Sequence, residues 1–303
     1  MQGKKQTLTY LAVMIAVVFW ASSFPATRYS LGYYSPGSIM LLRFLIASAT
    51  LVVIGAIKKI RLPHKRDFPL IGLSGFVGIF LYMFFFNTGT VHVASGVSGF
   101  VIATAPIFTL IMSRILLKEV VSVVCWVGVT VSFCGIVVIM FSQEVGFSLN
   151  IGVVILLLAS ISTSGYAIML RKLFKTYTAL EATTYAVVVA TFFMLVFLPG
   201  FISELPGSTI TVNMIIAYMG VFPAALAYLV WGYALSKAEK TAHVTVFLYL
   251  IPFLASLLAY LWLGETFSVW SFIGGVVIIL GMMLTNLRGK SNASGVPSGL
   301  PRR

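Results

Sequence analysis

The sequence predicts an all-α polytopic membrane protein with ten transmembrane helices, arranged as two inverted five-helix repeats with both termini in the cytoplasm. Three observations predict this fold: an apolar composition, ten long apolar runs, and a repeat between the two halves of the chain. Of the 303 residues, 60% are apolar and 9% are charged, and the mean hydropathy is +1.06. A soluble domain is about half apolar and roughly a quarter charged, so the composition excludes a soluble globular protein.

The apolar runs define the helices in order. Each run is about 20 residues long, which is enough to cross a bilayer, and short polar segments separate the runs. The first five predicted helices cover residues 8–27, 36–57, 68–89, 94–117 and 120–142. The second five cover residues 150–171, 180–199, 210–235, 241–263 and 268–286. An open β-sheet is excluded because lipid offers no partners for free backbone amides.

The basic residues set the orientation of these helices. The chain has 20 Lys and Arg residues against 7 acids, and its net charge is +13. With the N-terminus inside, every basic residue except Arg28 and Arg43 falls in a segment on the cytoplasmic side, as the positive-inside rule requires. The basic excess therefore reflects topology. It does not indicate nucleic-acid binding, because no basic stretch is long enough to form a domain for that purpose.

The two ends of the chain are predicted to lie outside the membrane. Residues 1–7 form a cytoplasmic N-terminal tail, and the apolar run after them is a retained helix because no small-residue cleavage site follows it. Residues 288–303 are polar and rich in Gly, Ser and Pro, which predicts a disordered cytoplasmic tail and also fits a remnant added for expression. Cys125 and Cys134 are nine residues apart on one predicted helix, so they cannot bridge each other.

The two halves of the chain, residues 8–142 and 150–287, repeat each other. A constant offset of 146 positions relates Tyr82 to Tyr228, Pro106 to Pro252, Glu119 to Glu265, Ser122 to Ser268, Gly128 to Gly274, and Gly135 to Gly281. Near the start of each half an offset of 142 pairs Ser22 with Ser164 and Arg43 with Tyr185. Because each copy has five spans, the second copy must cross the membrane upside down. Such a repeat gives two related conformations around a midplane site between the copies, as in secondary transporters.

Three motifs carry a family resemblance: the FWASSF stretch from Phe19 to Phe24, Arg43 early in the second helix, and paired P-x12-E patterns ending at Glu119 and Glu265. In these motifs the chain resembles the drug/metabolite transporter superfamily and, within it, the EamA family of ten-helix bacterial permeases. The resemblance covers about residues 8–286. It implies a multi-pass protein of the bacterial plasma (inner) membrane that carries amino acids, nucleosides or other small metabolites. It also implies a central cavity lined mainly by helices 1, 3, 4, 6, 8 and 9.

Aromatic and hydroxyl side chains on the helices of such a cavity are the candidate substrate-binding residues. They are Trp20, Ser22, Tyr82, Phe85, Asn87, Thr104, Ser164, Tyr166, Tyr228, Trp231 and Tyr249. Packing within the bundle and hydrogen bonds back to the same helix are the alternative roles for these residues. Thr104 is also placed to satisfy the turn that the next proline breaks. Four prolines are expected to bend their helices and to free carbonyl groups: Pro25, Pro106, Pro223 and Pro252.

Three of the ionisable residues in or beside the spans are candidates for a specific role. Arg43 is the one charge clearly inside a span, and such a residue is by default a functional candidate. It could attract a substrate carboxylate, but a structural role is favoured because the guanidinium is close enough to the outer surface to snorkel. Glu119 and Glu265 end the fourth and ninth helices. Each is expected to accept from free amides of the next helix, beside Ser122 and Ser268 as caps.

The sequence predicts neither an enzyme nor a cofactor or metal site. No His-Glu-x-x-His motif is present, and the spans contain almost no paired ionisable residues. A phosphate cradle for ATP is excluded because Leu284 occupies the position of its upstream glycine.

The predicted function is a secondary transporter that moves a small organic metabolite, an amino acid or a similar polar solute, by alternating access as an exporter or exchanger. Two alternatives remain open. One is proton-driven efflux of many drugs or cationic amphiphiles, and the other is a channel, although the sequence displays no pore-lining charge rings or carbonyl filter. The expected partners are the small-molecule substrate and membrane lipid, with no nucleic acid, and the protein is expected to be a monomer or a weak homo-oligomer.

Overall fold

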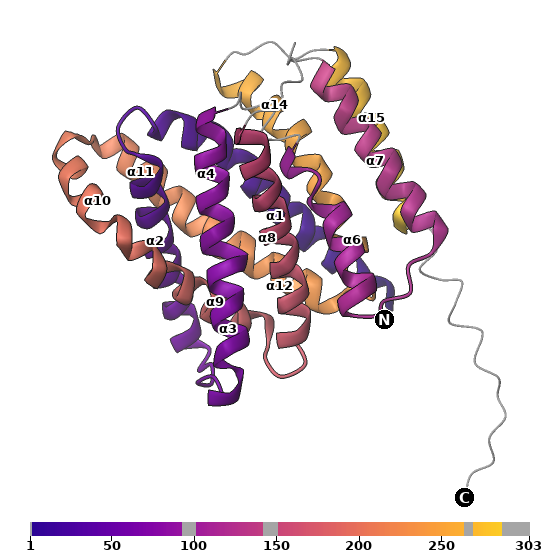
Figure 1. Cartoon of the computed structure of the whole chain (residues 1–303), viewed down its shortest axis with the longest axis horizontal. Coiled ribbons are helices and arrows are strands. Elements are labelled where there is room, and N and C mark those ends of the chain that lie inside the picture. The colour runs from indigo at the N-terminus through magenta and orange to yellow at the C-terminus, as the bar shows by residue number, and fades with distance from the viewer. Residues whose placement is uncertain (1, 93–100, 142–150, 264–268, 287–303) are drawn as a thin grey trace, which may run out of the picture.

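The structure is a computed structural model that describes residues 2–92, 101–141, 151–263 and 269–286. All regular secondary structure in these ranges is helical, and the helices form one bundle (Figure 1). Six helical segments are long and apolar enough to cross a membrane, and four shorter apolar helices lie at the positions of the remaining predicted spans. The all-helical polytopic fold class, with about ten helices, is therefore confirmed.

The first half of the chain forms the first copy of the repeat. Its elements are α1 (Gln2–Ser30), α2 (Pro36–Ile57), η1 (Lys65–Asp67), α3 (Phe68–Gly75), η2 (Phe76–Leu81), α4 (Tyr82–His92), α6 (Ala105–Leu116) and α7 (Val123–Phe141). The bounds of α2 match the prediction, because Pro36 starts its first turn and Ser35 caps it by accepting from the Ser38 amide. Helix α1 is longer than predicted, since polar residues continue it past the apolar run. The start of the fourth predicted helix lies in 93–100, outside the described residues.

The second half forms the second copy. Its elements are α8 (Ile151–Leu173), α9 (Ala179–Met194), η3 (Leu195–Phe197), α10 (Leu198–Glu204), η4 (Leu205–Gly207), α11 (Ile210–Met219), η5 (Gly220–Leu226), α12 (Ala227–Lys237), α13 (Ala242–Thr245), η6 (Val246–Tyr249), α14 (Leu250–Leu263) and α15 (Val269–Asn286). The predicted end at Pro199 is wrong. Pro199 lies in the first turn of α10, where a missing amide costs no hydrogen bond, so the chain stays helical beyond it.

The third span of each copy contains a π-helical segment at the same place. These segments are η2 and η5, and they end just before Tyr82 and Tyr228, respectively. Pro223 lies inside η5, whereas η2 contains no proline. In η2, Gly78 lets the backbone approach Tyr166 so closely that a Cβ would lie 2.6 Å from its Cδ2 atom. π-Helical turns are rare and are often found at functional sites. Their presence in both copies therefore indicates a functional site near Tyr82 and Tyr228.

Helices α7 and α15 lie side by side (Figure 1) and pack through small residues. The Ser132 hydroxyl donates to the Ile278 carbonyl at 3.2 Å. On either side of this bond, Gly128 faces Gly281 and Gly135 faces Gly274. Residue numbers fall along α15 as they rise along α7, so the two helices are antiparallel. Ser132 and Ile278 are themselves 146 positions apart, and an approximate two-fold axis therefore passes between them.

A second pair of equivalent residues lies on this axis and corrects the offset near the start of the copies. The hydroxyls of Ser48 on α2 and Thr191 on α9 are 2.7 Å apart, and these residues differ by 143 positions. At the same offset, Arg43 corresponds to Ala186: a Cβ on Gly220 would meet the Arg43 carbonyl, and one on Gly75 would meet the Ala186 carbonyl. The predicted offset of 142 is therefore wrong by one residue, because it rested on matching serine to serine.

The first helix of each copy packs mainly on the other copy. Helix α1 lies against α12 and α14, and its equivalent α8 lies against α4 and α6. Since α4 corresponds to α12 and α6 to α14, these contacts are related by the same two-fold axis. The two copies are therefore interlocked, and the space between them is enclosed by helices from both.

Large apolar side chains cover the outside of the bundle. Exposed examples are Val53 on α2 at 58%, Phe192 on α9 at 69% and Ile210 on α11 at 84%. A water-soluble monomer rarely exposes apolar surface on this scale, whereas lipid accepts it. The exposed apolar faces therefore agree with a bundle that is surrounded by membrane.

Candidate functional site

A cavity of about 90 Å³ lies between the two copies, which is room for several water molecules. Its walls are formed by α1, α2, α4, α6, α8, α12, α13, η6 and α14 and by residues 102–103. Both copies therefore contribute to one site. In the described part of the chain, no group of three His, Cys, Asp or Glu side chains is arranged to hold a metal ion.

Five of the candidate substrate-binding residues line this cavity. They are Trp20, Tyr82, Tyr166, Tyr228 and Trp231, and the helix-bending residue Pro252 joins them. The Trp20 ring lies 5.5 Å from Tyr228, edge to face, and 5.2 Å from Trp231, while the Tyr166 and Tyr228 rings are 5.9 Å apart. Such edge contacts are favourable between aromatic rings. The structure thus joins aromatic residues of both copies into one wall.

Trp20 also connects α1 to the π-helical segment of the second copy. Its indole Nε1 donates to the Pro223 carbonyl at 3.0 Å. This acceptor is the carbonyl of Pro223 itself, whereas the missing proline amide removes the helical donor to the carbonyl one turn earlier. The hydrogen bond fixes the orientation of the indole ring at the cavity wall.

Six other candidates do not line the cavity, and four of them have hydrogen bonds elsewhere. Ser22 donates to the Phe19 carbonyl at 2.8 Å and lies 2.7 Å from the Tyr218 hydroxyl. Thr104 donates to the Val101 carbonyl at 2.6 Å. Both hydroxyls donate to a carbonyl three residues earlier in the chain, which is the alternative role given above for these residues.

Asn87 and Ser164 connect neighbouring helices. Asn87 Nδ2 donates to the Pro36 carbonyl at 3.3 Å and so ties α4 to α2. Ser164 donates to the Ala105 carbonyl at 2.8 Å, next to Pro106 in the first turn of α6. The hydroxyl that serves this turn thus comes from the other copy.

The last two candidates pack among apolar groups. The Phe85 ring lies 5.9 Å from Phe84. Tyr249 is fully buried, and its hydroxyl has no hydrogen-bond partner among the described residues. Neither residue is part of the cavity wall in this conformation.

Residues that sequence reasoning missed follow a simple helical spacing. On α1 the cavity is lined by residues 20, 23 and 24, and on α8 by residues 163, 166 and 167. Phe24, Thr163 and Phe86 were not anticipated. Phe86 lies one turn after Tyr82, and its ring meets Phe24 edge to face at 5.9 Å. Spacing by three and four from Trp20, Tyr82 and Tyr166 would have identified these positions.

Arg43 lies on the cavity wall and not at the membrane surface. Its side chain is buried, with 6% of the residue exposed, so the expected snorkelling is wrong. The Nε atom has no hydrogen-bond partner within the described part of the chain. The guanidinium carbon lies 5.9 Å from the centre of the Phe44 ring, and the tyrosines 82, 218 and 228 are its electrostatic neighbours. Arg43 is the one charged residue among the described residues that line the cavity.

Glu119 joins the two copies at one end of the bundle. Its carboxylate accepts from the Thr241 hydroxyl at 2.8 Å and from the Thr241 amide at 3.1 Å, and it pairs with Arg171 at 3.3 Å. Arg171 also donates to the carbonyls of Leu235, at 3.0 Å, and Ala238, at 2.7 Å.

The prediction that Glu119 accepts from the first amides of the next helix is wrong. The chain turns at Lys118, whose φ is 54°, and the Glu119 carboxylate bonds to Thr241 instead. Ser122 does cap that helix, since its hydroxyl accepts from the Cys125 amide at 3.2 Å. Glu265 lies outside the described residues.

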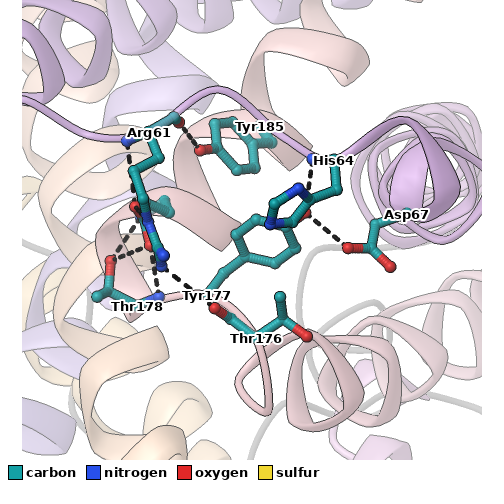
Figure 2. Close-up of polar contacts among 8 residues, drawn as sticks. Arg61, His64, Asp67, Thr176, Tyr177, Thr178 and Tyr185 are labelled. Carbon is teal, nitrogen blue, oxygen red and sulfur yellow. Dashed lines mark hydrogen bonds and ion pairs between the residues drawn. The ribbon is translucent and has the colours of Figure 1, made fainter.

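A second polar cluster joins the copies at the periphery of the same end (Figure 2). Glu181, in the capping box of α9, accepts from the Arg61 amide at 3.2 Å and pairs with its Nε at 3.3 Å. The Tyr177 hydroxyl donates to Asp67 at 2.7 Å and accepts from the His64 amide at 2.9 Å. Burial and the hydrogen bond to Asp67 raise the pKa of Tyr177. These contacts fix the α2–α3 connection against the α8–α9 turn, away from the cavity.

Comparison with known proteins gives consistent matches over nearly the whole chain. The model of the EamA-like transporter family matches residues 7–141 and 150–287. The uncharacterized transporter YdfC of Bacillus subtilis is 33% identical over 94% of this chain and 93% of its own length. A probable terminal-alkyne amino-acid exporter of Streptantibioticus cattleyicolor is 32% identical over 91% of this chain and 93% of its own length.

A crystal structure of a protein 19% identical to this chain matches it with a TM-score of 0.77, covering 92% of this chain and 96% of that one. At this identity the match shows a shared fold.

Proposed function

Because this chain belongs to the EamA-like transporter family and is a membrane transporter rather than an enzyme, we propose that it moves a small organic metabolite by alternating access. It acts as a secondary exporter or exchanger in a bacterial inner membrane. The observation that carries the proposal is the cavity between the copies, whose aromatic wall contains Trp20 of the first copy and Trp231 of the second. A solute held there contacts both copies, so relative motion of the copies changes its access.

The antiparallel contact of α7 and α15 supports inverted copies. We propose that the copies, residues 8–142 and 150–287, cross the bilayer in opposite directions, with both tails in the cytoplasm. An inverted repeat can adopt two packings that are related by exchanging the conformations of the two copies about the approximate two-fold axis. Helices α1 and α8 each pack on the opposite copy, and these contacts supply the surfaces that slide in such a motion.

The cluster of Glu119, Arg171 and Thr241 supports a closed cytoplasmic end. It lies where α6, α8 and α12 end, and its bonds join the first copy to the second. In the proposed cycle these bonds break when the cavity opens to the cytoplasm. The sequence repeats both charges, since Arg28 precedes Arg171 by 143 positions and Glu265 follows Glu119 by 146.

The cavity chemistry favours an amino acid or a similar polar solute over a cationic amphiphile. Aromatic rings and the hydroxyls of Ser23, Thr109 and Thr163 line it, and no acid is among its described lining residues. A cation would therefore lack a counter-charge there. One relative is named as an exporter of an amino acid, which supports the same solute class. We further propose that the protein acts as a monomer or a weak homo-oligomer.

Transport by purified protein in liposomes tests this proposal. Radiolabelled amino acids, nucleosides and a cationic amphiphile such as tetraphenylphosphonium are each followed with and without a pH gradient, and with an excess of unlabelled solute inside. We expect saturable counterflow of amino acids without a pH gradient. Accumulation of tetraphenylphosphonium alone, driven by protons, would instead establish multidrug efflux, and an ionic conductance far above carrier rates would establish a channel.

A further inference from the structure

We infer that the cavity binds a solute with a carboxylate group, and that Arg43 is the residue that receives this carboxylate. The inference rests on the proposed transport function and narrows its substrate class. It predicts that the solutes are monocarboxylates, either simple anions or zwitterions, and that the corresponding amides and amines are excluded.

The first step is that Arg43 is buried and lacks an acceptor. Its guanidinium stays charged at any physiological pH and offers five N–H donors. The Nε donor is unpartnered within the described ranges, and the ring of Phe44, at 5.9 Å, is a weak substitute for an acceptor. Burial of an unpaired charge is strongly unfavourable. The energetic cost of burying the Arg43 guanidinium without an acceptor therefore indicates that an anionic partner binds to it.

The second step is that the described part of the chain places no acid on the cavity wall beside Arg43. Of the seven acids, Glu144 and Glu265 lie in predicted loops, outside the described residues. The other five lie at the ends of the bundle, and four of them have partners there. Their contacts join Asp67 to Tyr177, Glu119 to Arg171 and Thr241, Glu181 to Arg61, and Glu204 to the Ser35 amide. The fifth, Glu239, follows α12. None of the described acids is therefore available as a counter-charge for Arg43, which leaves a bound ligand as the source that we infer.

The third step is that the fold holds the arginine in position at this level of the cavity. Helix α2 carries Arg43 against the π-helical segment η5, where a Cβ on Gly220 would lie 2.8 Å from the Arg43 carbonyl. The repeat-equivalent position in the second copy is Ala186, which is fully buried and apolar. The positive charge is thus a property of one copy, so the carboxylate has one orientation in the cavity.

The remaining wall suits the rest of such a solute. Tyr82 and Tyr228 lie beside the guanidinium, and their hydroxyls can donate to the same carboxylate. Trp20, Phe86 and Trp231 offer rings for an apolar side chain, and aromatic faces can accept an ammonium group. With one positive charge in the cavity, a single carboxylate neutralises it, whereas a dianion would carry an uncompensated charge.

Matched ligands test the inference on the purified full-length protein. The twenty amino acids, phenylacetate and benzoate are compared with phenylalaninamide, phenylacetamide and benzamide by the ligand-induced rise in melting temperature. We expect at least one acid to bind and its amide to bind at least about tenfold more weakly, because a hydrogen bond between charged groups is lost. Binding of acid and amide with equal affinity, or binding of no monocarboxylate, would overturn the inference.

Variants assign the effect to Arg43. We expect Arg43→Gln to lose the preference for the acid over its amide and Arg43→Lys to keep part of it. The matched control is Arg114→Gln, which removes the same charge from the exposed end of α6 and should leave the preference unchanged. Size-exclusion profiles verify folding of each variant, and Arg43→Lys provides the comparison if Arg43→Gln does not fold. Arg43→Gln protein that still prefers the acid would refute the assignment.

Transport measurements in liposomes distinguish failure of the carboxylate site from failure of the proposed transport function. Liposomes that exchange nucleosides or amides but no monocarboxylate would refute the carboxylate site and leave the transporter proposal intact. Liposomes that exchange none of the solutes would refute the transporter proposal itself. Exchange of monocarboxylates by wild-type protein and its loss in Arg43→Gln protein would support both.

Discussion

Replacement of Gly281 by alanine tests the close contact between α7 and α15. A Cβ on Gly281 would meet the Ser132 amide nitrogen and would lie 2.6 Å from the Gly128 carbonyl oxygen. Both are backbone atoms, so the helices must separate to admit the methyl group. Overpacking of this kind costs about 1–3 kcal/mol, whereas alanine in place of glycine gains about 1 kcal/mol from helix propensity. We therefore expect the free energy of unfolding to fall by up to about 2 kcal/mol.

Thermal unfolding in detergent, followed by tryptophan fluorescence, measures this change. At about 2–4 °C per kcal/mol, G281A should melt several degrees below the wild type. The equivalent G135A should behave alike, because its Cβ would lie 2.7 Å from the Gly274 carbonyl. The control is G72A on α3, where nothing lies within 4 Å of the added Cβ, so its melting temperature should stay equal or rise. A G281A protein as stable as G72A would refute the contact.

Three further predictions concern the interlocked copies. Trp20→Phe removes the donor to the Pro223 carbonyl at 3.0 Å, and the loss of this hydrogen bond should lower the unfolding free energy by about 1–3 kcal/mol. The change is measured as a lower melting temperature, and an unchanged melting temperature would show that this bond is not formed. Glu119→Gln removes the charge that pairs with Arg171, so a cysteine placed at Thr245 on the cavity wall should react faster with a cytoplasmic maleimide; equal rates would argue against a closed end held by this cluster. Cysteines at the exposed, repeat-equivalent positions 32 and 175 should react with an impermeant maleimide on opposite sides of the membrane, and reaction on one side would disprove the inverted copies.

The spans were predictable from sequence because lipid leaves the backbone few choices. An apolar run of about 20 residues must form a helix to satisfy its own amides, and Pro36 fixes the start of α2 in any context. The π-helical segment η2 was not predictable. Its sequence, FVGIFL, contains no proline, and its distortion accompanies the close approach of Gly78 to Tyr166, which is a residue of the other copy.

The aromatic part of the site was predictable, and its polar part was not. Tyr82, Tyr228 and Trp231 were identified because the three-residue spacing of Tyr82 and Phe85 recurs at Tyr228 and Trp231, and Trp20 because it lies too deep in the first helix to be an interface anchor. The polar misses have a common cause: a hydroxyl in a membrane helix can bond to its own turn or to a neighbouring helix, as Ser22 and Ser164 do, and sequence does not distinguish this from cavity exposure.

Arg43 was misplaced for a different reason. Its depth along α2 suggested a path to the outer surface, but the face of the helix on which it lies depends on packing against η5. Sequence distance from the end of a span measures depth and says nothing about direction around the helix axis.

The exchanged packing of α1 has a consequence for biosynthesis. The larger contacts of α1 are all with elements of the second copy, α11, η5, α12, η6 and α14. A nascent chain therefore inserts its first helix well before the partners of that helix have been translated. Until then, α1 lies in the bilayer without its native helix contacts. Neither half can mature separately, yet two fragments divided between residues 142 and 150 and produced together should assemble into a working carrier.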